Sequence, residues 1–239
     1  MLAMEVKVAT HIGQVRENNE DSYWVGPNCL AVCDGMGGHQ AGEVASRLAA
    51  EIISSYPFKG ENPGEEVRAA IEKAHKLVGY AASREQRYRG MGTTATLACI
   101  TTTEKKATKI TVGHVGDSRA YLFYQQELHL LTSDHSVVGE LIRTGTITSV
   151  EAKNHAKRHV LTQVLGSGQI EIELVSKTLE EAAILLLCTD GLTDVVEEER
   201  IKQILEQAHK FKNVAQELVD LANTLGGPDN ITVIVAQLS

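Results

Sequence analysis

The chain has 239 residues, of which 43% are hydrophobic and 23% charged, and its 23 basic and 31 acidic side chains leave a formal net charge of −8. This composition is typical of a soluble globular protein, and single domains with a mixed or all-β fold reach about 250 residues. We therefore expect one domain over residues 1–239. The acidic balance excludes a strongly basic surface, so we expect no nucleic-acid or membrane partner.

The chain contains no segment typical of a membrane span or a secretion signal. Its longest purely apolar run, Ala182 to Cys188, is far shorter than the roughly 20 residues that cross a bilayer. Residues 1–10 lack the basic start and apolar run of a signal peptide, so we expect a cytoplasmic location. The four cysteines form no CxxC pair or zinc spacing, and we interpret them as buried small hydrophobic residues: Cys29, Cys33, Cys99 and Cys188.

Runs of β-branched and apolar residues predict strands, and apolar residues at steps of three and four predict helices. The strands are expected at residues 4–10, 29–34, 93–103, 108–115, 119–124, 170–176, 183–189 and 231–238, and the helices at 41–55, 65–87, 137–143, 198–208 and 213–225. The strands from 93 to 131 have connections too short for a parallel crossover, so we expect neighbours among them to pair antiparallel. This pattern favours helices layered over antiparallel sheets.

One long polar segment interrupts the series of strands. Residues 139–168 contain four glycines and a basic cluster of Lys153, Lys157 and Arg158. Segments of this kind run over the surface and often carry function. We expect a flap-like insertion here, within the single domain.

Aspartates follow several of the predicted strands at the point where each strand ends. Asp34, Asp117 and Asp190 each stand beside glycine after an apolar run, and Asp229 stands just before the last strand. Any one of them alone is a common turn residue. If the strands are neighbours, however, the four carboxylates converge, and their repulsion is relieved by divalent cations that prefer oxygen ligands. The sequence therefore points to Mg²⁺ or Mn²⁺ rather than to zinc.

A polar loop near the start of the chain adds an arginine to this group. Arg16 stands in the run RENNED, which ends in Asp21. A guanidinium matches a phosphate bidentately while metal ions hold the other phosphate oxygens. Phosphate chemistry thus becomes the leading hypothesis.

The chain is similar to a known family along nearly its whole length, from His11 to Val235. It resembles the type 2C metal-dependent serine/threonine protein phosphatases, particularly the compact bacterial members. The resemblance rests on motifs in the family's order: RENNED (16–21), VCDGMGGH (32–39), GMGTTAT (90–96), HVGDSRAY (114–121), TSDHS (132–136), LCTDGLTD (187–194) and GGPDNITV (226–233).

The resemblance implies an α+β fold, a four-layer α-β-β-α sandwich with two central antiparallel sheets flanked by helices. It also implies two metal ions, with a third in many bacterial members. By analogy Asp34 bridges two ions, Gly35 offers its backbone carbonyl to one, and Asp21 approaches that same ion. Asp190 and Asp229 hold the other ion, and Asp117 with Asp190 would hold a third.

The implied reaction is direct attack on phosphoserine or phosphothreonine by a hydroxide that bridges the metal ions. No cysteine has an arginine six positions later and no glycine precedes a lysine, which excludes a cysteine-phosphatase loop and a nucleotide-binding P-loop. Arg16 is expected to hold phosphate. The proton donor for the leaving oxygen is open between His39 and a metal-bound water.

Three residues inside the motifs have more modest expected roles, and the substrate is defined only by class. Glu20 is expected to support a metal-bound water through a hydrogen bond. Thr93 and Thr94 are expected to be strand and packing residues. The partners are expected to be phosphoproteins, substrates of a cognate serine/threonine kinase in bacterial signalling, and the chain is expected to be a monomer. Two alternatives remain: a catalytically silent sensor or binding module, and a phosphoesterase for small molecules.

Overall fold

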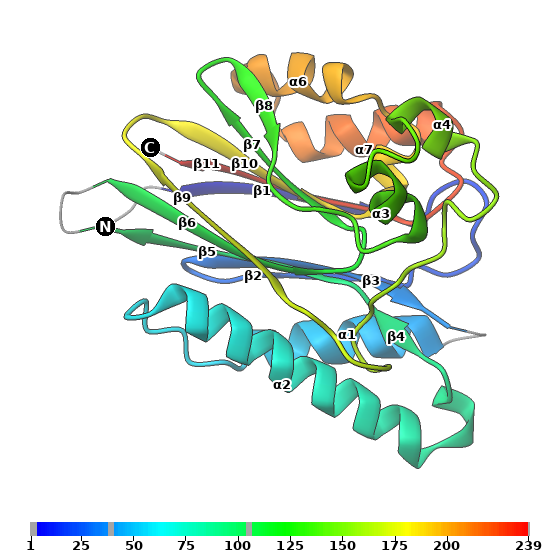
Figure 1. The fold of residues 1–239 in the computed structure, drawn as a ribbon. Helices are drawn as coiled ribbons and strands as arrows, with labels where there is room; N and C mark the ends of the chain where they lie inside the picture. The colour runs from blue at the N-terminus through cyan, green and yellow to red at the C-terminus, as the bar shows by residue number, and fades with distance from the viewer. Residues whose placement is uncertain (1–3, 38–40, 104–106, 239) are drawn as a thin grey trace.

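The computed structural model describes residues 4–37, 41–103 and 107–238. Two antiparallel sheets lie face to face, and helices cover the outer face of each sheet (Figure 1). The order of layers is helices, sheet, sheet, helices. This confirms the four-layer α+β sandwich that the motifs imply.

The first sheet pairs a strand from the beginning of the chain with a strand from its end. Its strand order is β1 (Met4–His11), β11 (Ile231–Leu238), β10 (Ala183–Cys188), β7 (Arg119–Tyr124) and β8 (Glu127–Leu130). Each neighbouring pair is antiparallel, and β1 pairs with β11 over its full length, from Met4 opposite Leu238 to His11 opposite Ile231.

The second sheet contains the strands from the first half of the chain together with β9. Its order is β2 (Asp21–Val25), β3 (Cys29–Met36), β5 (Ala95–Thr102), β6 (Thr108–Val115) and β9 (Glu173–Leu179). A short strand, β4 (Gly92–Thr93), pairs with the last residues of β3, and its Thr93 also forms an isolated bridge with Leu165. The pairing with β4 holds the end of β3 where Asp34 and Gly35 lie.

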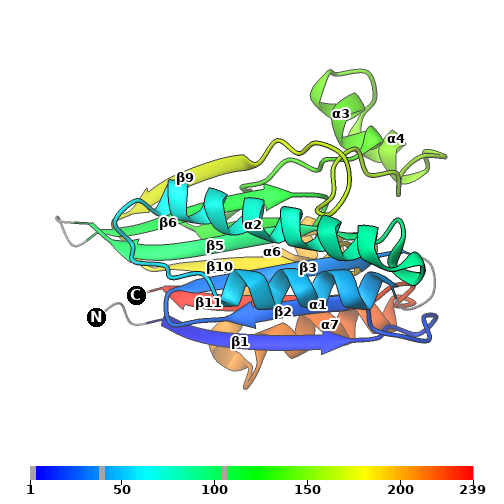
Figure 2. The ribbon, with the colours of Figure 1, turned by 90° about the horizontal axis from the view of Figure 1, so that it is seen from below.

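Two helices cover each sheet because each helix has one apolar face. The second sheet is covered by α1 (Ala41–Ser54) and α2 (Pro63–Arg84), as both views show (Figures 1 and 2). The first sheet is covered by α6 (Glu198–Glu206) and α7 (Val214–Thr224). In α7 the buried positions recur at helical spacing, and the Asn213 side chain caps the helix by accepting from the Ala215 and Gln216 backbone N–H groups.

The central core lies between the two sheets. Leu30 and Val32 on β3 face Leu185 and Leu187 on β10, and all four side chains are buried. The intervening residues of β3 face the helices instead, so this strand is buried on both sides and its sequence is continuously apolar. Burial of each leucine stabilises the fold by about 2 kcal/mol, which makes the sandwich a rigid support for the strand ends.

Most predicted elements occur within a few residues of their expected bounds. The sequence analysis missed some of the elements that the structure contains. The strand expected at 170–176 begins later, at Glu173, and the helices expected at 65–87 and 198–208 each end in a separate 3₁₀ turn, Gln86–Tyr88 and Ala208–Lys210. The missed elements are short: β2, β8, α4 (Ser149–Lys153) and α5 (Asp190–Thr193). Few residues leave little periodicity to detect.

The expected pairing of consecutive strands is wrong at one place. β6 and β7 are joined by a bend at residues 116–118, yet they do not pair, because β6 lies in the second sheet and β7 in the first. A short connection forces antiparallel pairing only when both strands stay in one sheet. Here the bend crosses from one sheet to the other, and it carries Asp117.

All four cysteines are buried, as expected, but two of them are joined by a disulfide that the sequence analysis did not predict. Cys29 and Cys99 form a disulfide, with their Cα atoms 4.2 Å apart. They are separated by 70 residues in sequence but lie directly opposite each other on β3 and β5. Strand register, which the spacing of cysteines does not reveal, brings them together. Cys33 and Cys188 are free and buried, as expected.

The polar segment after β8 contains two short helices, α3 (Val137–Arg143) and α4, which stand away from the sandwich (Figure 2). Both begin with a side-chain cap. Ser136 accepts from the Gly139 backbone N–H, and Thr148 forms a reciprocal capping box with Glu151. Among the described residues, none of the helices is long and apolar enough to span a membrane.

Candidate metal centre

Two of the predicted aspartates face each other across neighbouring strands. Asp21 is the first residue of β2, and its registered partner on β3 is Asp34. Opposite residues of an antiparallel pair project to the same side of a sheet, so both carboxylates lie on one face. Thr189 donates its hydroxyl to Asp21 Oδ2 at 2.8 Å, which ties this pair to the first sheet.

The other sheet contributes Asp190 and Asp229. Asp190 follows β10 directly as the first residue of α5, and Asp229 precedes β11 by two positions. Because β10 and β11 are antiparallel neighbours, the end of one strand lies beside the start of the other. The sheet topology therefore brings together two carboxylates that are far apart in sequence.

Asp117 reaches the same place from the bend between the two sheets. Burial, followed by the charges of neighbouring aspartates that include Asp117, raises the pKa of Asp34 and that of Asp190. The structure thus gathers at one end of the sandwich the five aspartates that the sequence singled out.

The electrostatics of this cluster are unfavourable without a cation. Burial, followed by the charges of Asp21 and Asp190, holds the pKa of Asp34 well above its ordinary value. Burial also raises the pKa of Asp21. Two buried oxygens, Asp21 Oδ1 and Asp190 Oδ1, have no hydrogen-bond partner within the residues that the structure describes.

This set of donors fits hard divalent cations. All the converging side-chain ligands are carboxylate oxygens, which Mg²⁺ and Mn²⁺ prefer. A bound ion would neutralise the repulsion and would give the two unpartnered oxygens a ligand. Asp190 also belongs to a group with Asp194 and His159 whose ligand atoms are close enough to one another to hold a metal ion. His159 comes from the segment after α4, and its Nδ1 lies 3.8 Å from Asp194 Oδ2.

Gly35 lies where the backbone of β3 is most closely packed. A Cβ atom at this position would come 2.1 Å from the Gly42 carbonyl oxygen and 2.5 Å from the Glu20 carbonyl oxygen. Glycine is therefore required by a close approach of three backbones. The Gly35 N–H donates to the Glu20 carbonyl at 3.1 Å, so the residue beside Asp34 is fixed by the loop that leads into Asp21.

Arg16 lies at the outer side of the cluster. Its Nη2 is 2.6 Å from Asp229 Oδ2, and its side chain is half exposed. Asn230 supports the same corner, since its amide donates to the Ile12 and Asn18 carbonyls and its Oδ1 accepts from the Glu20 N–H. The loop that carries Arg16 is thus fastened to the loop that carries Asp229.

Two threonines hold the backbone of Asp34, a contribution that sequence reasoning missed. Thr93 donates its hydroxyl to the Asp34 carbonyl at 2.8 Å, and the Asp34 N–H donates to Thr94 Oγ1 at 2.8 Å. Thr94 Oγ1 also lies 2.8 Å from Ser118 Oγ, beside Asp117. The only signal in the sequence is that these buried strand residues are hydroxylic rather than aliphatic.

Glu20 contributes chiefly through its backbone. Its carbonyl accepts from the Ser46 hydroxyl and from the Gly35 N–H, and its side chain lies against Gly42 at the start of α1. Burial raises the pKa of Glu20. His39 lies outside the described residues, so its place relative to the cluster is not part of this structure.

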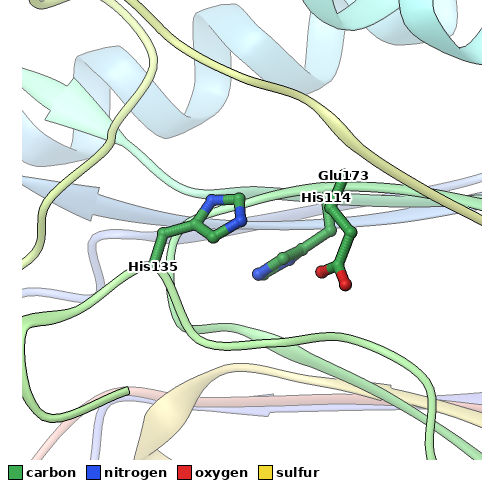
Figure 3. Close-up of side chains that lie close together, drawn as sticks. All are labelled: His114, His135 and Glu173. Atoms are coloured by element: carbon green, nitrogen blue, oxygen red, sulfur yellow. The ribbon is translucent and has the colours of Figure 1, made fainter. Parts of the chain in front are cut away.

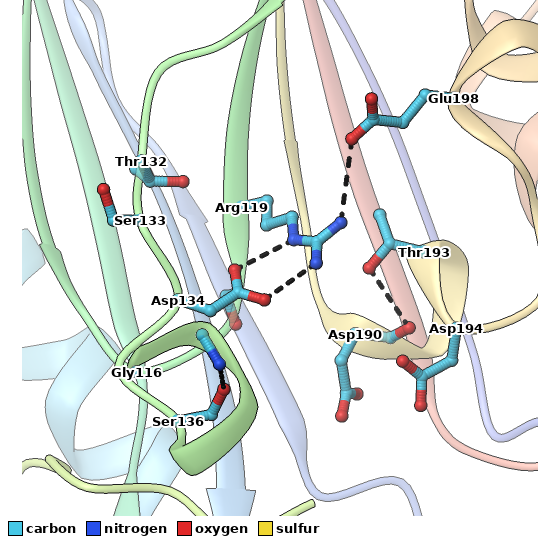
Figure 4. Close-up of polar contacts among 12 residues, drawn as sticks. Gly116, Arg119, Thr132, Ser133, Asp134, Ser136, Asp190, Thr193, Asp194 and Glu198 are labelled. Carbon is cyan, nitrogen blue, oxygen red and sulfur yellow. Dashed lines mark hydrogen bonds and ion pairs between the residues drawn. The ribbon is translucent and has the colours of Figure 1, made fainter. Parts of the chain in front are cut away.

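A partly buried ion pair flanks Asp117 and was also missed from the sequence. Arg119 donates from Nε and Nη2 to the two carboxylate oxygens of Asp134 at 2.9 and 2.7 Å, and its Nη1 lies 3.8 Å from Glu198 Oε1 (Figure 4). Tyr121 completes the group by accepting from Arg119 and donating to Glu198. This network joins the bend at Asp117 to the segment that leads into α3.

Comparison with known proteins gives matches over nearly the whole chain. The sequence profile described as protein phosphatase 2C matches residues 11–226. The serine/threonine phosphatase stp of Listeria monocytogenes is 35% identical over 246 residues, which cover 98% of this chain and 96% of the relative.

Solved structures agree with the sequence matches. The Mycobacterium tuberculosis serine/threonine phosphatase PstP/Ppp superposes with a TM-score of 0.90 at 34% identity, and the match covers 100% of both chains. A structure of the PstP catalytic domain in complex with two manganese ions has a TM-score of 0.88 at 34% identity, with 100% of this chain and 99% of that one covered.

Proposed function

Because the chain belongs to the protein phosphatase 2C family, and the relatives described above are serine/threonine phosphatases, we propose the following roles for its residues in the hydrolysis of phosphate esters. The protein is a metal-dependent serine/threonine protein phosphatase, and its substrates are phosphoproteins. The observation that supports the residue assignment is the convergence of the aspartates from both sheets, two of which have unpartnered buried oxygens.

In the proposed arrangement, Asp34 would be shared by two divalent cations, Mn²⁺ or Mg²⁺. Asp21 and the Gly35 carbonyl would help to hold one cation, and Asp190 and Asp229 would help to hold the other. A third cation would lie between Asp117 and Asp190. When bound, paired cations of this kind lower the pKa of a shared water and polarise the phosphoryl oxygens.

The protein's part in the reaction is to place these groups and to orient the phosphate. Arg16 is half exposed at the edge of the cluster, where a guanidinium can hold two phosphoryl oxygens in a fixed direction. Thr93 and Thr94 hold the Asp34 backbone so that its carboxylate keeps one position. The leaving seryl or threonyl oxygen takes a proton from His39 or from water.

Phosphate release from a phosphothreonine peptide tests this proposal. With Mn²⁺ present, we expect turnover by the wild-type protein and a loss of more than about 100-fold in Asp34→Asn and Asp190→Asn, because removal of a ligand exceeds the 10- to 100-fold effect of an outer contact. Asp220→Asn, a charge change on the exposed side of α7, is the matched control. Turnover near the wild-type rate in either ligand variant would contradict the assignment, and preference for nucleotides over phosphopeptides would indicate a small-molecule phosphoesterase.

We further propose that the protein is a cytoplasmic monomer that reverses the action of a cognate serine/threonine kinase. Residues 139–168 form a flap within the one domain, and the basic side chains there contact the phosphoprotein: Arg143, Lys153, Lys157, Arg158 and His159. Light scattering of the purified protein tests the proposed monomeric state, and cell fractionation tests the proposed cytoplasmic location. Comparison of KM for phosphopeptides between wild type and a Lys157→Ala variant tests the flap contact.

A further inference from the structure

Two buried histidines, His114 and His135, lie beside the bend that carries Asp117, and the mechanism described above does not use them (Figure 3). Their ring centroids are 4.9 Å apart. His114 is at the end of β6, and His135 precedes α3 by two residues. With Glu173 they form a group whose side chains are close enough to hold a metal ion.

The hydrogen bonds around the two rings argue against a metal site. His114 Nε2 lies 2.9 Å from the Gly116 carbonyl, which can only accept, so Nε2 carries the proton. The remaining nitrogen, Nδ1, lies 2.9 Å from the Thr96 hydroxyl. Burial, followed by the neighbouring His135, lowers the pKa of His114 to about 3, so the ring is neutral. His135 Nδ1 accepts from the Gly116 N–H at 3.3 Å.

These contacts converge on one residue, Gly116. Its carbonyl accepts from His114 Nε2 and from the His135 backbone N–H at 2.6 Å, while its own N–H donates to the His135 ring. The Gly116 carbonyl belongs to the peptide group that continues into Asp117. The two histidines therefore hold the peptide planes on both sides of Gly116, including the plane that begins Asp117.

The position of Gly116 requires a glycine, and a glycine needs support from neighbouring groups to keep one conformation. Its φ is +113°, a conformation that favours glycine. A Cβ atom would also come 2.5 Å from Thr94 Cγ2. A glycine in a bend between two sheets is free to adopt other conformations, so the position of Asp117 depends on groups that hold the glycine from outside.

His135 also lies where the flap leaves the sandwich. Its carbonyl accepts from the Thr162 N–H at 2.8 Å, and the next residue, Ser136, forms an isolated bridge with Leu161. One histidine thus contacts both ends of the flap and the residue before Asp117.

We propose that His114 and His135 are positioning residues that clamp Gly116 and thereby set the position of Asp117 for the third cation. This inference rests on the proposed assignment of Asp117 as a ligand of that cation. Supporting contacts of this kind change metal affinity by about 10- to 100-fold when they are removed. We expect the third cation to bind most weakly, because only Asp117 and Asp190 are proposed to hold it, and the clamp leaves the ligands of the other two cations unchanged.

Calorimetric titration of the purified protein with Mn²⁺ tests the clamp. In His114→Leu and His135→Leu, we expect the dissociation constant of the weakest ion to rise by about 10- to 100-fold, with the other two ions bound as in wild type. His114→Gln places an amide N–H near the position of Nε2, and His135→Asn places an amide oxygen near that of Nδ1. Both conservative variants should restore the affinity to near the wild-type value.

A matched control separates positioning from loss of stability. His75 on α2 also accepts a glycine N–H through Nδ1, from Gly166 at 3.1 Å, but it is not in the group around Asp117. His75→Leu should lower the melting temperature without changing the affinity for any of the ions. If the leucine variants of the clamp do not fold, His114→Asn is tested in their place, because its shorter amide does not reach the Gly116 carbonyl. The dissociation constant of the weakest ion should then rise as expected for the leucine variants.

Three results would overturn the proposal, and they are distinguishable. Folded clamp variants that bind the weakest ion as wild type does would refute the clamp, provided that Asp117→Asn loses that ion. If Asp117→Asn also binds it normally, or if wild type binds only two ions, the ligand assignment itself is wrong. Binding of Zn²⁺ that disappears in Glu173→Gln would show that the histidine group is a metal site instead.

Discussion

Asp21 and Asp34 occupy opposite positions on β2 and β3, so two carboxylates share one face of the sheet at the end where the strands stop. Neither their sequence separation nor the composition of either strand requires this. The register of a single antiparallel pair creates the repulsion that a cation relieves.

The first prediction concerns stability as a function of pH. Burial raises the pKa of Asp21 and that of Asp117 to about 7, above the value of about 4 for an unfolded aspartate. A group whose pKa rises on folding stabilises the fold below its unfolded pKa, and this contribution is lost as pH rises through the folded pKa. The metal-free protein should therefore lose stability from these groups between about pH 4 and pH 7.

The measurement is the difference in melting temperature between samples with Mn²⁺ and with EDTA, taken from pH 5 to pH 8. We expect the difference to grow with pH. The opposite contribution of His114, whose lowered pKa removes stability as pH falls, is present in both samples and cancels. A difference that stays constant over this range would contradict the expectation.

The second prediction concerns the close approach at Gly35. In Gly35→Ala the new methyl group would collide with the Gly42 and Glu20 carbonyls, and relief of such overpacking costs about 1 to 3 kcal/mol. Urea denaturation should show this loss, and Mn²⁺ titration should show weaker binding, because the shift displaces Asp34. In the control Gly64→Ala, nothing lies within 4 Å of the new methyl group, and stability should be unchanged or slightly higher.

The third prediction concerns the ion pair beside Asp117. Arg119→Lys replaces two parallel N–H···O bonds to Asp134 with a single ammonium contact. We expect the free energy of unfolding to fall by about 2 kcal/mol, because a largely buried carboxylate loses part of its pairing. Lys202→Met, which removes the exposed contact with Glu127, should leave the urea midpoint near the wild-type value. Equal midpoints for the two variants would show that the Arg119 pair contributes no more than a surface contact.

The fourth prediction concerns the disulfide. Reduction of Cys29–Cys99 should lower the free energy of unfolding by about 2 to 4 kcal/mol. It should leave Mn²⁺ affinity unchanged, because Cys29 is at the other end of β3 from Asp34, roughly 16 Å along the strand. A thiol assay in denaturant should find only Cys33 and Cys188 reactive before reduction. Reactivity of all four, or an unchanged midpoint after reduction, would argue that the bond does not form.

The sequence predicted the parts of the fold that depend on local pattern. Long apolar runs such as 183–189 mark strands, and the aspartate that follows such a run marks the end of a sheet. The motifs from 16–21 to 226–233 then indicated the family and its sandwich, which the structure and the comparisons confirm. The metal roles of the aspartates stay predictions that the experiments above address.

What the sequence did not predict depends on pairing between distant segments. No local pattern shows that the chain changes sheets between β6 and β7, or that Cys29 is opposite Cys99. The hydrogen bond between the Asp34 N–H and Thr94 joins residues 60 positions apart. Register and layer order determine such contacts, and neither can be read from one strand alone.

The pairing of β1 with β11 has a consequence for synthesis. β1 can join the first sheet only after β11 has been made, because β11 is its neighbour in that sheet, and Arg16 contacts Asp229 just before β11. A growing chain therefore cannot complete this corner until residues 229–238 have emerged. We expect chains that stop before residue 229 to lack phosphate release.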